Sequence, residues 1–318
     1  MSHHRKKLWV GIGTCMLLGS AGAQAEDKPA TETHASTGIL VASAGGEGGE
    51  AGHGGEGGEA GHGGEGGEAG QGAGAMSVFA SGGEGGEGGE GGEGGEGGEG
   101  GSVPSAMDSP GVYYSHLTFM LGHMHVGREL FEAGEIGIAR THMGHPVAEH
   151  LPKVEAALGA RGFDDVDDAL KELARTAGNA ETWSDVADAY AAAEESIRSA
   201  MADVDEEYLQ DPAFLARVLT AVIQQSRHEY EEALNEGRFV NAQEYHDSRG
   251  FMQVGRALLE ERAEVFRAAD ADAYAELVER FEAVMEAWPS VQPPQSPALT
   301  VSEVYGRASA FEFAASRY

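Results

Sequence analysis

The histidines of the second part of the chain are grouped closely enough to hold a metal ion. Eight of them lie between residues 116 and 246. His116 and His123 are two helical turns apart, so on an α-helix they share one face, with Met120 between them. The residues beside this stripe are apolar, and a buried imidazole needs a partner. One explanation is a neutral core histidine with a single hydrogen bond, and the other is a ligand or cofactor site.

A second group follows in the stretch THMGHPVAEH, residues 141–150. His142, His145 and Glu149 are spaced by three and four residues, which places them on one face of a continuous helix. Imidazoles and carboxylates that converge from facing helices suit Fe, Mn or Zn. The alternative is that Gly144 and Pro146 break the helix, so that Glu149 only favours the positive end of a new one. The candidate ligands from both stretches are His116, His123, His142, His145 and Glu149.

The remaining reactive side chains give weaker patterns. His228 lies opposite an apolar stripe, so we expect its side chain to be solvated. The position of His246 argues neither for nor against a metal site. Glu244 stands at a capping-box distance from Asn241, and Asp247 falls in the first turns of the same helix. The sequence contains no Gly-x-Ser-x-Gly elbow and no phosphate-binding glycine loop. Any catalysis would need the metal, so the pattern favours a binding protein over an enzyme.

The elements that carry these residues are helices. Apolar residues recur with helical spacing between Gly, Pro, Asn and Asp breaks, and strand signals are almost absent. We therefore predict an all-α fold, a helical bundle. The expected helices cover residues 110–134, 146–162, 165–176, 181–203, 211–236, 241–269, 270–287 and 301–316.

The amino-terminal segment reads as an export signal. Residues 1–25 combine a basic start, the apolar run LWVGIGTCMLLG and a final AQA. Cleavage there would remove Cys15, the only cysteine, and leave a chain without thiols. Acylation of Cys15 is the less favoured alternative. We expect a periplasmic or secreted protein with no transmembrane segment in the mature chain, in which His, Asp, Glu or Met must hold any metal.

A long segment of low complexity, residues 26–102, separates the signal from the bundle. It is mostly glycine and glutamate, which predicts disorder, although the apolar island Met76–Ala80 could dock. The bundle domain then covers residues 103–318. The chain has 21 basic and 53 acidic residues and a net charge of -32, which excludes nucleic acid as a partner and favours cations.

The run YEEALNEGRFVNAQEYHDSRGF, residues 230–251, resembles exported helical domains that accompany Ftr-type iron permeases. Those domains carry a Gly-Lys-Val-Val-Asn-x-x-Glu-Tyr-x-Asp/Glu link between two helices. The elements HMHVGRELFEAGE and HPVAEHL are also similar to imelysin-like periplasmic proteins. The usual imelysin-like signature is Gly-x-His-x-x-Glu, whereas here Gly144 is followed directly by His145 and then by Glu149. RELFE, residues 128–132, fits the Arg-Glu-x-x-Glu pattern of the permeases themselves.

The resemblance implies an exported protein that binds a transition metal, with iron first, for uptake or handling beside an inner-membrane metal permease. Zinc and manganese are alternatives, and copper would be favoured if Met120 coordinates. Noncovalent heme on His116 or His123 also stays open. A different class of function is a non-catalytic structural or adaptor bundle, whose acidic linker engages an envelope partner.

Overall fold

The computed structural model of the chain describes residues 74–80 and 104–318. The expected signal peptide, Cys15 and most of the glycine-glutamate segment lie outside the described residues. Within the described ranges the fold is an all-α bundle, as predicted. The α-helices are α2 (Pro110–Glu132), α3 (Ile136–His145), α4 (Leu151–Arg161), α5 (Asp165–Asn179), α6 (Ala187–Ala202), α7 (Glu206–Leu209), α8 (Pro212–Glu232), α9 (Ala242–Glu261), α10 (Ala263–Ala269), α11 (Ala271–Met285) and α12 (Val301–Ala315).

Shorter elements complete the described part of the chain. Residues Ser77–Phe79 (η1) and Trp183–Asp185 (η3) form single 3₁₀ turns, and Pro146–His150 (η2) forms a π-helical turn. Two strands that the sequence did not predict, β1 (Leu234–Asn235) and β2 (Arg238–Phe239), pair antiparallel between α8 and α9. They make a short hairpin. None of the described helices is both long and apolar enough to cross a membrane.

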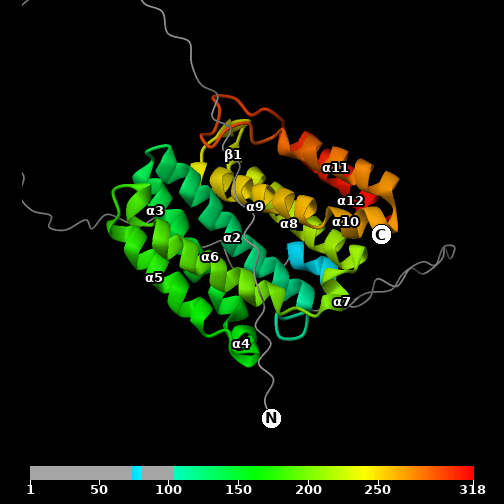
Figure 1. The fold of residues 1–318 in the computed structure, drawn as a ribbon. Helices are drawn as coiled ribbons and strands as arrows, with labels where there is room; N and C mark the ends of the chain where they lie inside the picture. The colour runs from blue at the N-terminus through cyan, green and yellow to red at the C-terminus, as the bar shows by residue number, and fades with distance from the viewer. Residues whose placement is uncertain (1–73, 81–103) are drawn as a thin grey trace, which may run out of the picture. The chain divides into compact units, whose positions relative to one another are not determined.

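Helix α2 is the central helix of the bundle. Ser109 caps its first turn by accepting from the backbone N–H of Val112, and Pro110 occupies the first position. Of its 23 residues, 18 are buried, because helices α3, α6, α8 and α9 pack around it (Figure 1). A helix that is surrounded by other helices in this way has almost no face open to solvent. The sequence placed His116 and His123 on one buried stripe, whereas the structure buries nearly every face of α2.

The backbones of α2 and α9 approach each other at two glycines. A Cβ atom on Gly250 would lie 2.3 Å from the carbonyl oxygen of Gly122, so only hydrogen fits there. Glycine inside a helix costs about 1 kcal/mol relative to alanine, and the close approach explains why both are present. Gly122 precedes His123, and Gly250 follows Asp247 by three residues. This contact therefore brings His123 of α2 close to Asp247 of α9.

The remaining helices lie to either side of this pair. Helices α3 to α6 pack on one side of α2, and the α11–α12 pair packs against α8 on the other (Figure 1). Besides the helix start predicted at Pro146, two predicted boundaries were wrong. The helix expected from residue 181 begins at Ala187, after the 3₁₀ turn, and the one expected over residues 241–269 is divided at Arg262 into α9 and α10.

Candidate metal centre

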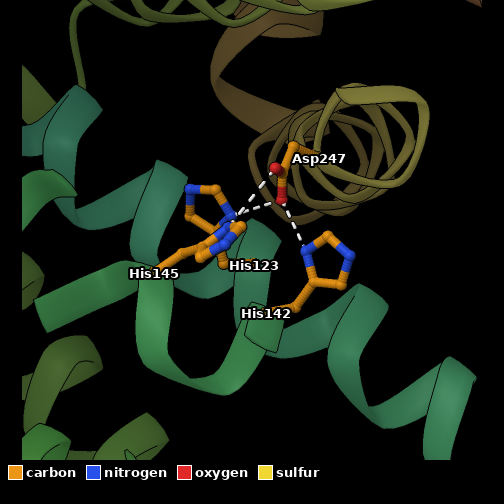
Figure 2. Close-up of side chains that lie close together, drawn as sticks. All are labelled: His123, His142, His145 and Asp247. Atoms are coloured by element: carbon orange, nitrogen blue, oxygen red, sulfur yellow. Dashed lines mark hydrogen bonds and ion pairs between the residues drawn. The ribbon is translucent and has the colours of Figure 1, made fainter. Parts of the chain in front are cut away.

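Four buried side chains from three helices meet at the middle of α2. His123 comes from α2, His142 and His145 from α3, and Asp247 from α9. One ligand atom of each lies within 4.8 Å of one ligand atom of every other. The three imidazoles surround the Asp247 carboxylate in Figure 2. Three of the predicted ligands thus lie together. The fourth member, Asp247, was not predicted to be a ligand.

Asp247 holds this group together through hydrogen bonds. Its Oδ1 atom accepts from Nδ1 of His123 at 2.6 Å and from Nδ1 of His142 at 2.8 Å. Its Oδ2 atom lies 3.3 Å from Nδ1 of His145. A single ionised carboxylate can accept from several donors, and hydrogen bonds to a charged acceptor are the short ones. The arrangement fixes the orientation of the His123 and His142 imidazoles before any ion binds.

The π-turn η2 links α3 directly to α4. The backbone N–H of Leu151 donates to the carbonyl of Pro146, five residues back. Pro146 and Pro152 both lack an N–H, so two of the ordinary α-helical bonds cannot form here. The prediction that Pro146 starts a separate helix was wrong. The alternative, in which Gly144 and Pro146 break the helix, was wrong for the same reason, since the helix runs on through a wider turn.

The π-turn also brings His150 to the site. In an α-helix, two residues five apart point about 140° away from each other. A π-turn instead aligns residues five apart, and His150 accordingly falls on the same side as His145. Its Nε2 atom lies 3.0 Å from Nε2 of His123. His150, His123 and Glu149 form a second group whose ligand atoms lie within 4.8 Å of one another.

His123 is shared by the two groups. Its Nδ1 faces Asp247, and its Nε2 faces His150 and, at 3.3 Å, Oε2 of Glu149. Glu149 also lies 3.3 Å from His145, and its side chain is 21% exposed, whereas those of the histidines and Asp247 are nearly closed to solvent. Solvent therefore reaches the centre on the side of Glu149.

His116, the fifth predicted ligand, belongs to neither group but contacts a member of the second. Its Nδ1 atom lies 3.2 Å from Nδ1 of His150. At the opposite end, Nδ1 of His246 lies 3.3 Å from Nε2 of His142. The structure thus places His116 and His246 against the outer nitrogens of the group residues, where they orient them. His125 and His228 belong to neither group.

Charge is concentrated on His123 and Asp247. Burial lowers the pKa of His123, but Asp247 and Glu149 outweigh it and raise this pKa to about 10. Burial raises the pKa of Asp247, but the neighbouring histidines, His123 first, hold it well below its usual range. Burial lowers the pKa of His116 to about 3, and burial together with the charge of His123 lowers that of His150. Without metal the site thus contains an imidazolium–carboxylate pair, and metal binding must release a proton.

The donor set fits a borderline transition metal. Imidazole nitrogens with one or two carboxylate oxygens suit Fe, Zn, Mn and Cu better than Mg or Ca. Nδ1 of His145 is buried and makes no hydrogen bond to a described residue, although carboxylate oxygens lie 3.3 Å away. Such an unpartnered nitrogen, facing the centre of the group, is available to a cation. This group could hold a metal ion.

Residues 205–316 match the family model of the iron permease-associated 4-helix bundle domain. This range contains α7 to α12, and the match confirms the resemblance to domains associated with Ftr-type permeases. Asp247 lies inside the matched range, whereas His123, His142 and His145 lie outside it. No curated protein and no solved structure matches the chain. The likeness to imelysin-like proteins stays a prediction.

Proposed function

We propose that this protein binds a transition metal ion, with iron as its physiological ion, for metal uptake or handling. The observation that carries the proposal is the buried group of His123, His142, His145 and Asp247. A protein interior contains so many convergent ionisable groups only where they have partners or a function. Among the nitrogens of these three imidazoles, Nδ1 of His145 has no hydrogen-bond partner among the described residues and is available to a cation.

Iron is favoured by the context of the matched domain. The family description associates that domain with iron permeases, and the ligand set accepts Fe²⁺. Zn²⁺ and Cu²⁺ bind most nitrogen-rich sites more tightly than Fe²⁺ does, so affinity in the test tube does not identify the ion used in the cell. The protein's own metal content, recovered from cells, decides between them.

The partner and the location belong to the same proposal. An exported bundle that binds iron would deliver it to, or receive it from, an inner-membrane metal permease. The acidic surface supports this use, because a net charge of -32 raises the local concentration of cations. The expected export signal lies outside the described residues, so export is tested by finding the mature amino terminus in the periplasm or medium.

The test compares two variants of the full chain with the wild type. Asp247→Asn keeps the shape of the side chain and removes the charge at the centre, whereas His228→Ala removes a histidine that belongs to neither group. Each metal-free protein is titrated with Fe²⁺ without oxygen, and with Zn²⁺ and Mn²⁺, followed by elemental analysis of the isolated protein. We expect the tight stoichiometric site to be lost only in Asp247→Asn.

Two results would contradict the proposal. One is the absence of stoichiometric binding of any of these ions to the wild type, which favours the adaptor alternative. The other is full retention of binding in Asp247→Asn. The choice of iron fails separately if the site exists but protein isolated from iron-replete cells contains another metal, or if Asp247→Asn restores iron uptake to a deletion strain.

A further inference from the structure

Two glutamates lie outside both histidine groups, where α8 packs against α9. Glu229 of α8 is 5% exposed, and its carboxyl group lies beside that of Glu244 on α9. Glu244 is half-buried. Two carboxylates repel each other strongly in the protein interior, so they can approach this closely only with a proton or a cation between them.

A buried amide completes this arrangement. Gln225, one helical turn before Glu229, is also 5% exposed, and its Nε2 donates to Oε1 of Glu229. Oε1 of Gln225 and Oε2 of Glu229 are buried and have no hydrogen-bond partner among the described residues. Buried oxygens are nearly always partnered, so each of these two indicates an ion or a water beside it. Gln225 presents its Nε2 atom to Glu229, and it offers its oxygen to a cation there once the amide is turned over, in place of that hydrogen bond.

We propose that Glu229, Glu244 and Gln225 form a second cation site, built from oxygen atoms alone, that takes a hard divalent ion such as Mn²⁺ or Mg²⁺. Carboxylate and amide oxygens are the ligands these ions prefer, and water molecules fill their remaining positions. The half-buried Glu244 gives the site a side open to solvent. It differs in chemistry from the nitrogen-rich centre, and it does not depend on iron being bound there.

The second site is a near neighbour of the histidine centre. Glu244 precedes Asp247 by three residues on α9, which places both on one side of the helix. Nε2 of the adjacent Gln243 lies 3.2 Å from Nε2 of His145. Two cations in such neighbouring sites repel each other, so we expect occupation of the histidine centre to weaken binding at the glutamates.

The state of the pair without metal agrees with this assignment. Burial raises the pKa of Glu229 to about 9, and Glu244 raises it further in the same direction. A proton therefore occupies the position of the cation at neutral pH. The cation must displace it, so binding strengthens as the pH rises.

Mn²⁺ tests the proposal, because bound and free ion are separated by electron paramagnetic resonance. The full metal-free chain is titrated with Mn²⁺ at mildly alkaline pH, as wild type, Glu229→Gln, Glu244→Gln and Glu232→Gln. Glu232 is an exposed residue of the same helix and serves as the matched control. We expect both Glu229→Gln and Glu244→Gln to lose one equivalent of bound Mn²⁺, and Glu232→Gln to retain it.

The outcomes separate this site from the histidine centre. Asp247→Asn should lose the Mn²⁺ coupled to ¹⁴N nuclei and keep the equivalent that lacks this coupling. Unchanged stoichiometry in Glu229→Gln and Glu244→Gln would overturn the proposal, since the pair then shares only a proton. So would ¹⁴N coupling on every bound Mn²⁺. If Glu229→Gln does not fold, the half-buried Glu244→Gln gives the same answer.

Discussion

The Nδ1 atom of His123 lies 2.6 Å from Oδ1 of Asp247, although 124 positions separate the two residues in the sequence. This contact joins the central helix α2 to α9, beside the close approach of Gly122 and Gly250. It also connects the histidine-bearing part of the chain to the part that matches the iron permease-associated domain. The same pair therefore supports both the packing of the bundle and the proposed metal centre.

Asp247→Asn should destabilise the metal-free protein. Removing one partner of a buried ion pair leaves the other charge uncompensated, which costs about 3–5 kcal/mol. Urea unfolding followed by circular dichroism measures this loss. Glu132→Gln is the control, because its ion pair with Arg128 is exposed on both sides, and such pairs contribute about 0–1 kcal/mol. Equal effects of the two substitutions would contradict the assignment.

Metal should raise the melting temperature of the wild type. An ion present at about 100 times its dissociation constant stabilises the folded state by about 2.7 kcal/mol. For a folded body of this size each kcal/mol raises the melting temperature by about 2–4 °C, so we expect a shift of roughly 5–11 °C, reversed by a chelator. His142→Ala should abolish the shift. Thr141→Ala, an exposed neighbour, should keep it, and a shift that persists in His142→Ala contradicts the site.

Helical spacing predicted part of the candidate centre. It placed His142 and His145 on one face of a helix and His123 on a buried face of another, and the structure brings these three side chains together. Asp247 could not be found in this way, because an acidic residue near a helix start has an ordinary explanation. Its partner is set by tertiary packing. The signal for that packing was the pair of helix-interior glycines, which only a close approach of two backbones explains.

His150 was missed for a different reason. A regular α-helix turns it away from His142 and His145, and only the π-turn brings it back. The two prolines at residues 146 and 152 were the available signal, since together they remove two helical hydrogen bonds within one turn. Glu244 was interpreted as half of a capping box. In the structure Asn241 caps α9 by accepting from the N–H of Gln243, and Glu244 accepts from the Asn241 side chain at 3.3 Å instead of from its backbone, with its carboxyl group beside that of Glu229.

His150→Ala should weaken metal binding more than His116→Ala does. His150 belongs to a group whose atoms can reach one ion, whereas His116 belongs to neither group and is hydrogen-bonded to His150. Losing a group that ligates or orients a ligand costs about 10–100-fold in affinity. Either substitution leaves one buried nitrogen unpartnered, at about 1–3 kcal/mol, so stability does not explain a difference. Competition with a chromogenic chelator measures both affinities, and a larger effect from His116→Ala would reverse the assignment.

Above about pH 6.5, where the histidines with a lowered pKa are neutral in the folded and the unfolded state, the stability of the metal-free protein should fall as the pH rises, in part through Glu229. Burial first, and then Glu244, raise its pKa from 4.5 to about 9. The folded state holds this proton where the unfolded chain has released it, so the contribution is complete below pH 4.5 and is lost as the pH rises through about 9.

Glu229→Gln imitates the protonated group and should reduce this slope. A remainder of the same sign persists, because the pKa of His123 is raised to about 10. Urea unfolding at several pH values across this window measures the slope, with Glu232→Gln as the exposed control. If the slope of Glu229→Gln equals that of the wild type, the carboxyl pair does not titrate as described.

Gly111→Ala should release the docked segment that contains η1. Met76 is 2% exposed, and the Phe79 ring lies against α2 so closely that a Cβ atom on Gly111 would stand 2.2 Å from its Cε1 atom. The added methyl group favours the helix by about 1 kcal/mol but displaces the ring. Cleavage by chymotrypsin after Phe79 measures the release, at about tenfold in rate for each 1.4 kcal/mol of docking lost. Gly137→Ala in α3 is the matched control, because a Cβ atom there meets nothing within 4 Å. It should leave cleavage unchanged, and equal cleavage of the two variants would show that Gly111 is not needed to hold the segment.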